Sequence, residues 1–271
     1  VQGTIGVYRN ENNSYENAVG GIIGKAYRTC YIKNCINRAQ IVSDKELSST
    51  STGGIVGEAS YSKITGSQNY GTIQCNSGYG YAGGIAGESR TVDECFNAGN
   101  IVGTVESGID AGGIAGKSYI IKNSYNVGTV ISKATAGGIC GSASTVSSCY
   151  NAGNVSVISA GEADEWSDGY AGGIAGENAY NIDNCYNTGV VKSNRGSSGG
   201  IAGSASNSSS TYIKQCYNIG NVSCDSGNTG AILGKGSVTI ANCFYLDNVS
   251  KGVGSGTDTA TQYTAEQLQN A

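Results

Sequence analysis

The chain has 271 residues, of which 44 are Gly and none is Pro, Met or His. Its 20 acidic and 16 basic residues give a net charge of −4, which disfavours a nucleic-acid partner because the phosphate backbone attracts basic proteins. The absence of His excludes Ser–His triads, Cys–His dyads and His-containing zinc sites. No apolar run approaches the roughly 18 residues of a membrane span, so we expect no membrane insertion.

A five-residue motif, Gly-Gly-Ile-x-Gly, recurs along the chain with 25 to 35 residues between the first glycines of successive copies. The copies begin at Gly20, Gly53, Gly83, Gly112, Gly137, Gly172, Gly199 and, in the altered form Gly-Ala-Ile-Leu-Gly, Gly230. A fixed period of this length is typical of repeat proteins, in which one repeat buries its apolar face only against its neighbours. The sequence therefore predicts a stack of similar coils.

Two further blocks follow most copies of the motif. The second block reads apolar-x-x-Cys-aromatic-Asn, as in 92–97, and the third reads Gly-Asn/Thr-Ile/Val, as in 99–101. Each block is short, rich in β-branched or aromatic residues and bounded by Gly, Asn or Ser, which is typical of strands rather than helices. Three short strands per coil predict an all-β, parallel β-helix of about eight coils, right-handed according to the crossover rule for parallel strands.

In a parallel stack, equivalent residues of successive coils lie ~4.8 Å apart and form ladders. We expect the motif isoleucines to form a dry core, and the motif glycines to supply positive φ angles and a close approach of the backbones. We also expect an asparagine ladder in a corner, where Asn tolerates the left-handed conformation and its amide can bond to the next coil. This ladder comprises Asn37, Asn69, Asn97, Asn126, Asn151, Asn187 and Asn218.

Six of the ten cysteines occupy the position that precedes the aromatic residue of the second block. They are Cys35, Cys95, Cys149, Cys185, Cys216 and Cys243. We expect buried free thiols that pack as small apolar groups; disulfide bonds between neighbouring coils are the alternative, although their dihedral angles would not suit every pair. There is no Cys-x-x-Cys, so neither a zinc site nor a redox motif is supported.

The three blocks together, Gly-Gly-Ile-Ala-Gly, Cys-Tyr-Asn-x-Gly and Gly-Asn-Val, resemble the GLUG motif over roughly residues 1–246. This repeat is found in bacterial surface adhesins and in the non-catalytic parts of immunoglobulin A metallopeptidases. The resemblance implies an extracellular, cell-surface location. It supplies no catalytic residues, because the peptidase motif His-Glu-x-x-His cannot exist in a chain without His.

The solenoid is expected to comprise residues 1–246 and to begin inside a coil, because 3–7 matches the third block. Residues 247–271 are expected to form a linker, with a short helix introduced by a capping box at 264–267. Further domains of the same polypeptide are expected beyond these boundaries.

Surface aromatic residues are the candidates for ligand binding. The aromatic residue of the second block forms a row that points outward if the cysteines point inward, and the loop 159–170 carries four acids and the only Trp. The alternative for the row is that the rings only cover the coil edges. The alternative for the loop is a solvated acidic segment, and the loop lacks the sequence pattern of known calcium-binding loops. The proposed ligand surface comprises Trp166, Tyr170, Tyr79, Tyr81, Tyr125, Tyr150, Tyr186 and Tyr217.

The sequence favours a non-catalytic repeat module of a bacterial cell-surface protein, which acts as an adhesin or a structural spacer. A carbohydrate-binding module that uses the surface aromatics is the alternative, and a polysaccharide-degrading β-helix enzyme is less favoured. We expect no catalytic residues, metal ligands or cofactor. The expected partners are host or microbial glycans or surface proteins.

Overall fold

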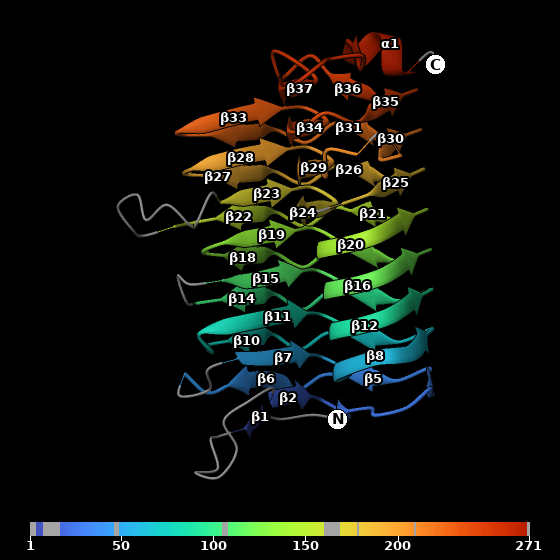
Figure 1. Ribbon diagram of the computed structural model, residues 1–271, viewed down its shortest axis with the longest axis vertical. Helices are drawn as coiled ribbons and strands as arrows, with labels where there is room; N and C mark the ends of the chain where they lie inside the picture. The colour runs from blue at the N-terminus through green and yellow to red at the C-terminus, as the bar shows by residue number, and fades with distance from the viewer. Residues whose placement is uncertain are drawn as a thin grey trace.

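The computed structural model describes residues 4–7, 17–45, 49–104, 108–159, 169–177, 179–208 and 210–269. In these residues the strands form four sheets, A to D, which run the length of one stack with parallel pairing throughout the repeats (Figure 1). The prediction of an all-β, parallel solenoid is confirmed. Sheet A contains eight described strands, one from each coil, and about seven turns of the chain connect them. This number is close to the eight coils expected.

The third block of each repeat forms sheet A, and the segment that leads into the Gly-Gly-Ile motif forms sheet B. Sheet A contains β1 (Thr4–Val7), β6 (Gln40–Ser43), β10 (Ile73–Cys75), β14 (Ile101–Gly103), β18 (Val130–Ser132), β22 (Val155–Val157), β27 (Val191–Ser193) and β32 (Val222–Cys224). Sheet B contains β2 (Asn17–Gly20), β7 (Ser49–Gly53), β11 (Tyr79–Gly83), β15 (Ile109–Gly112), β19 (Thr135–Gly137), β23 (Tyr170–Gly172), β28 (Gly196–Gly199) and β33 (Gly227–Gly230).

The second block and the residues before it form sheets C and D. Sheet C contains β3 (Ile23–Lys25), β4 (Tyr31–Lys33), β8 (Val56–Thr65), β12 (Ala86–Asp93), β16 (Ala115–Lys122), β20 (Cys140–Ser147), β24 (Ala175–Glu177), β25 (Asn181–Asp183), β29 (Ala202–Ser204), β30 (Tyr212–Lys214), β34 (Leu233–Lys235), β35 (Thr239–Ala241) and β37 (Val253–Ser255). Sheet D contains β5 (Ile36–Asn37), β9 (Gln68–Asn69), β13 (Phe96–Asn97), β17 (Tyr125–Asn126), β21 (Tyr150–Asn151), β26 (Tyr186–Asn187), β31 (Tyr217–Asn218), β36 (Phe244–Leu246) and β38 (Thr261–Tyr263).

A coil thus contributes to four sheets rather than the three strands expected, because a bend divides the second block between sheets C and D. One residue at this bend is left-handed in each repeat, as at Glu94, where φ is 53°. The same conformation occurs at Asn34, Gly66, Asn123, Ser148, Asn184, Gln215 and Asn242. The bend lets both the apolar residue that opens the block and the cysteine point inward; Val92 and Cys95 are both fully buried.

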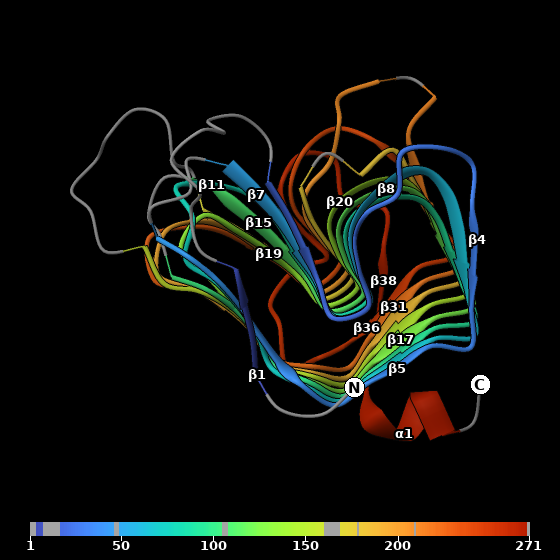
Figure 2. The same ribbon diagram turned by 90° about the horizontal axis from the view of Figure 1, so that it is seen from below.

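Seen from the N-terminal end, the chain runs clockwise from sheet A through B and C to D as it recedes, so the solenoid is right-handed (Figure 2). The corner between sheets B and C, formed by the Gly-Gly-Ile motif, points into the molecule rather than outward. This corner reaches sheet D, because a Cβ atom on Gly113 would lie 2.3 Å from Cγ of Asn126. The cross-section is therefore pinched into two lobes.

The core is formed by the predicted ladders. The motif isoleucines from Ile55 to Ile232 are fully buried, whereas Ile22 of the first described copy is exposed. The motif glycines allow the backbones of adjacent coils to approach closely. The prediction that they have positive φ angles is wrong, because the glycines with positive φ in the described chain lie outside the motif.

The asparagine ladder is confirmed as a buried chain of amides. Nδ2 of Asn126 donates to Oδ1 of Asn151 at 2.8 Å, and Nδ2 of Asn151 donates to Oδ1 of Asn187 at 2.8 Å. Each amide also bonds the backbone two residues on, as Asn151 does with N and O of Gly153. These asparagines lie in sheet D and are not left-handed, which corrects that part of the prediction; the left-handed residue lies three positions earlier.

The cysteine ladder is also confirmed as an inward-facing row of free thiols. Cys95, Cys149, Cys185, Cys216 and Cys243 are buried, and only Cys35 of the row is partly accessible. Their thiols donate to backbone carbonyl oxygens; for example, Sγ of Cys149 lies 3.2 Å from O of Ser147. Burial raises the pKa of the Cys95 thiol to about 11, so thiolate, the reactive form, is scarce at neutral pH.

We expect an alkylating reagent at pH 8 to label Cys30 first in the native protein, because Cys30 is exposed. The five buried cysteines of the ladder should react only after denaturation, when the reagent can reach their thiols. Mass spectrometry of peptides labelled before and after denaturation measures this. Three or more ladder cysteines recovered as disulfides would contradict the free-thiol row.

Residues 247–271, expected to be a linker, continue the stack in part. β37 pairs with β34 and β38 pairs with β36, while the Asp258 carboxylate accepts a hydrogen bond of 2.7 Å from N of Gly252. The predicted capping box is confirmed at α1 (Ala265–Gln269): Thr264 N donates to Gln267 Oε1 at 2.8 Å and Gln267 N donates to Thr264 Oγ1 at 3.2 Å. In the described part of the chain, no helix has the length and hydropathy needed to cross a membrane.

Candidate functional site

The aromatic row predicted from the second block forms a column on the outer face of sheet D. Ring centroids of Tyr125 and Tyr150, of Tyr150 and Tyr186, and of Tyr186 and Tyr217 are 4.9, 4.9 and 4.8 Å apart. The planes of these pairs differ by 7°, 3° and 1°, so the rings stack face to face. Phe96 extends the column at 4.5 Å from Tyr125.

This stacking determines which parts of the rings are accessible to a ligand. The asparagine beside each ring is fully buried, whereas Tyr125 and Tyr217 expose 36% and 38% of their surface, so the rings do lie on the outside. Their faces, however, pack against the rings of the adjacent coils, and mainly edges and hydroxyl groups remain accessible. Burial, together with the neighbouring phenols, raises the pKa of Tyr150. Because sugars stack on ring faces, the geometry favours the alternative that the row covers the coil edges.

The remaining residues of the proposed ligand surface lie elsewhere. Tyr79, Tyr81 and Tyr170 belong to sheet B, which is separated from sheet D by the rest of the cross-section (Figure 2). Tyr79 is 60% exposed, and Tyr81 and Tyr170 are half-buried. Trp166 and the acids of the loop 159–170 lie outside the described residues. The proposed surface is therefore at least two surfaces, and a single ligand would not contact both.

Tyr81 and Tyr170 line a notch, which we define as the region where the outer faces of sheets B and C approach each other. Across it, Lys117 Nζ of sheet C donates to the Tyr81 hydroxyl of sheet B at 3.3 Å and lies 4.9 Å from the ring centroid. Lys117 also pairs with Glu88 of the adjacent coil at 3.5 Å. The charged residue that follows the motif thus pairs with its equivalent in the adjacent coil, as Lys25 also does with Glu58, and Lys117 faces another sheet rather than open solvent.

Asp110 is the notable titratable group of the notch. It lies in sheet B between Tyr81 and Thr135 and is half-buried. Burial and the charge of Glu177 raise the pKa of the Asp110 carboxyl to about 7, against smaller opposing effects of a Thr135 hydrogen bond and the Lys117 charge. Its proton is therefore retained in the folded protein at a pH where the unfolded chain has lost it.

We expect Asp110→Asn to stabilise the protein at pH 8 by about 1–3 kcal/mol and to have little effect near pH 4. A carboxyl whose pKa rises on folding destabilises the native state progressively as the pH increases from its unfolded to its folded pKa, here from 3.8 to about 7. The neutral amide removes this dependence. Urea denaturation of both proteins between pH 4 and 8 measures it; parallel curves would contradict the assignment.

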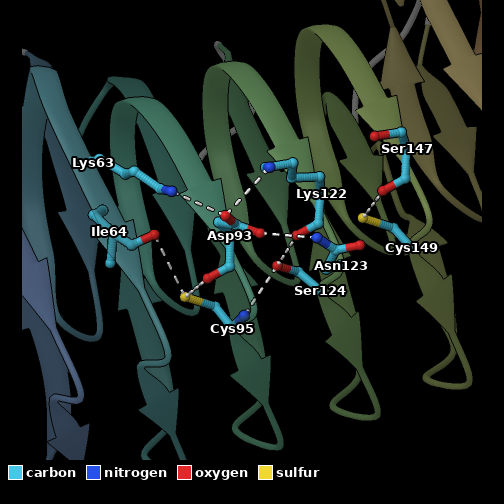
Figure 3. Close-up of polar contacts among 9 residues, drawn as sticks. All are labelled: Lys63, Ile64, Asp93, Cys95, Lys122, Asn123, Ser124, Ser147 and Cys149. Carbon is cyan, nitrogen blue, oxygen red and sulfur yellow. Dashed lines mark hydrogen bonds and ion pairs between the residues drawn. The ribbon is translucent and has the colours of Figure 1, made fainter.

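A second charged cluster lies on the outer face of sheet C (Figure 3). Oδ2 of Asp93 lies 3.1 Å from Lys63 Nζ and 3.4 Å from Lys122 Nζ, and Oδ1 accepts a bond of 3.0 Å from Asn123 Nδ2. Burial alone would raise the pKa of the Asp93 carboxyl, but the Asn123 and Lys63 hydrogen bonds and the lysine charges hold it below its usual value. One buried carboxylate thus positions two exposed ammonium groups from the coils on either side.

Metal binding receives no support from the geometry of the described residues. Among the residues that the structure describes, no three His, Cys, Asp or Glu side chains are grouped as a metal site would require. The four acids of the loop 159–170 lie at 162–168, outside the described residues.

Sequence reasoning missed four of the most exposed rings among the residues that the structure describes. Tyr27, Tyr31, Tyr61 and Tyr119 lie at the outer bend and flank of sheet C and expose 78%, 72%, 65% and 52% of their surface. They follow the charged residue after the motif by two to six positions, and this variable spacing conceals them in an alignment of repeats. A search for tyrosines within two positions of a basic residue would have found all four.

Comparisons with known proteins agree with this architecture. Residues 167–192 match the profile of the GLUG motif, and they span parts of sheets B, C, D and A in one repeat. No protein of curated function matches the sequence. The fold is similar to a crystal structure described as that of "a putative immunoglobulin A1 protease from Bacteroides ovatus", with 22% identity, a TM-score of 0.56, and coverage of 89% of this chain and 80% of that one. The chain therefore carries the GLUG motif, folded as one turn of a parallel β-solenoid.

Proposed function

We propose that this chain is a non-catalytic module of a bacterial cell-surface protein, which acts as a rigid spacer and presents adhesive loops along one edge. The observation that carries the proposal is the unbroken set of ladders. The buried amide chain and the outer column of stacked rings connect adjacent coils along most of the stack. Such a stack resists bending between coils, as a spacer requires.

The edge between sheets A and B supports the adhesive part of the proposal. The connections there range from two residues between β18 and β19 to twelve between β22 and β23, whereas the sheets keep their register. Tyr79 and Ile158 at this edge expose 60% and 54% of their surface. Loops that vary in length on a rigid scaffold are a frequent location of binding residues.

The non-catalytic part of the proposal rests on the polar groups. Lys25, Lys63, Lys117 and Lys122 are each held in a cross-coil ion pair with Glu58, Asp93 or Glu88, and His is absent from the whole chain. The cell-surface setting is supported by the resemblance to the GLUG repeat of surface proteins.

Three proteins test the proposal: the full chain, a variant in which the loop 158–169 is replaced by a Gly-Ser segment of equal length, and a variant lacking the two coils 83–136. We expect beads coated with the full chain to adhere to glycan arrays or bacterial cells. The loop variant should lose adhesion, and the deletion variant should fold, adhere and be shorter by ~10 Å in small-angle X-ray scattering.

Adhesion by the loop variant equal to that of the full chain would contradict the adhesive loops. A deletion variant that does not fold would contradict the modular spacer. Cleavage of immunoglobulin A or of a polysaccharide by the purified chain would contradict the non-catalytic assignment.

A further inference from the structure

The outer bend and flank of sheet C differ from the rest of the surface in charge. Basic residues occur there in the first four described coils, with at least one from each coil: Arg28, Lys33, Lys63, Arg90 and Lys122. In these four coils the acids of the same rows are Asp93, which is buried between two lysines, and Glu94; Asp183 follows in the Asp93 row two coils beyond Lys122. This area, which we call the basic flank, is thus positive on a chain whose net charge is −4.

The register places Lys33, Lys63 and Lys122 in two neighbouring rows of sheet C that run along the solenoid axis. Tyr31 pairs with Lys63, Lys63 with Thr91 and Thr91 with Ile120, while Asp93 pairs with Lys122 in the adjacent row. Alternation keeps Ile64 and Val92 buried and directs their neighbours outward. Each of these coils thus contributes at least one cationic group, so the groups advance along the axis by about one coil rise, ~4.8 Å, while alternating between rows.

Two cationic groups of the basic flank lie over the rings of exposed tyrosines. Lys33 Nζ lies 5.7 Å from the Tyr31 ring centroid, and the Arg90 guanidinium lies 5.0 Å from that of Tyr119. These rings do not join the face-to-face column of sheet D, and each is more than half exposed. The flank therefore combines accessible ring surface, phenolic hydroxyl groups and positive charge.

The lysines beside Asp93 are held in place before any ligand arrives. The side chains of Lys63 and Lys122 remain 40% and 42% exposed while they share one carboxylate that is itself 7% exposed (Figure 3). An ammonium group has three N–H donors, so each lysine retains donors for a further acceptor. Positioning by a buried anion lowers the entropy cost of ordering these long side chains on binding.

From these features we propose that the basic flank binds an acidic polysaccharide whose chain runs along the solenoid axis. A polyuronate carries one carboxylate on each sugar ring, and each ring advances the chain by a length close to one coil rise. The carboxylates would pair with Lys33, Lys63, Arg90 and Lys122, and sugar rings would contact the faces of Tyr61 and Tyr119. This binding is independent of the spacer role and of the loops between sheets A and B.

Charge complementarity favours this ligand over nucleic acid. A DNA duplex carries one charge per ~1.7 Å of its axis, which is far denser than one cation per coil. Proteins that bind nucleic acid by such contacts carry a strongly basic face on a basic domain, whereas this chain is acidic overall.

The test uses polygalacturonate as the probe and its methyl ester, which has the same backbone without charge, as the control ligand. Titration calorimetry of the purified chain should show binding to polygalacturonate that weakens as salt is added, and no binding to the ester. The double variant Lys33→Gln/Arg90→Gln should bind about tenfold more weakly, because each exposed ion pair contributes modestly. Tyr61→Ser/Tyr119→Ser should weaken binding without changing its dependence on salt.

A matched control removes a basic residue from the opposite side of the molecule: Lys192→Gln, on sheet A. This variant should bind like the unmodified chain, and circular dichroism should show that all variants fold. The proposal would be overturned by failure of the unmodified chain to bind polygalacturonate, by equal binding of the ester, or by equal weakening in the control. Tighter binding of oligothymidylate than of polygalacturonate would instead identify the flank as a nucleic-acid surface.

Discussion

Replacement of Gly87 by Ala should destabilise the protein by about 2–4 kcal/mol, because the new methyl group has no space. A Cβ atom at Gly87 would lie 2.5 Å from N of Thr52 and 2.7 Å from O of Gly57. These are backbone atoms of the adjoining coil and cannot move without breaking the pairing of sheets B and C. Urea denaturation followed by circular dichroism measures the loss.

The equivalent glycine of the first described motif provides the control. A Cβ atom at Gly24 would meet only O of Ala18 within contact range, at 3.1 Å, so Gly24→Ala should change the stability by less than about 1 kcal/mol. If both substitutions have the same effect, the cost arises from the backbone preference of glycine and not from the contact between the sheets.

Replacement of Asn151 by Leu should cost about 3 kcal/mol, because it interrupts the amide chain in the middle of the stack. Nδ2 of Asn151 donates to O of Gly153 at 2.7 Å and to Asn187 at 2.8 Å, and Oδ1 accepts from N of Gly153 at 3.2 Å. Leu has a similar volume but leaves these buried groups without partners, each at a cost of about 1–3 kcal/mol. Thermal and urea unfolding both measure the effect.

Asn154→Ala is the matched control, three residues further along the same coil. Asn154 is exposed, and its Oδ1 accepts one bond, of 3.1 Å, from N of Val190. Water replaces such a bond, so the stability should change by about 0.5 kcal/mol or less. A loss at Asn154 as large as that at Asn151 would show that the buried ladder has no special role.

The repeat made most of the architecture predictable. When coils stack in parallel, equivalent positions must lie above one another, and a residue type that recurs at one position reveals the environment of the whole row. The buried rows that contain Ile85, Cys95 and Asn97, and the outer row that contains Phe96, follow from this reasoning. The capping box at Thr264 is equally predictable, because it depends on residues three positions apart.

The backbone conformations were predicted less well. Asn97 and the motif glycines are the residue types that most readily adopt positive φ, yet the left-handed residue of that coil is Glu94. Sequence preference failed there because the fold requires a bend just before Cys95, whatever residue occupies the position. The same position holds Asn, Gly, Ser or Gln in other coils.

The sequence by itself determined the all-β class, the parallel stack, the period of the coils and which rows are buried, because each of these depends on residues that repeat. Only the tertiary structure decided that the tyrosines of sheet D stack face to face, that Lys117 of sheet C meets Tyr81 of sheet B, and that Lys63 and Lys122 share Asp93. These contacts join residues of different rows or coils whose spacing in the chain varies. Their positions depend on where the corner between sheets B and C points, and the repeat pattern contains no signal for that direction.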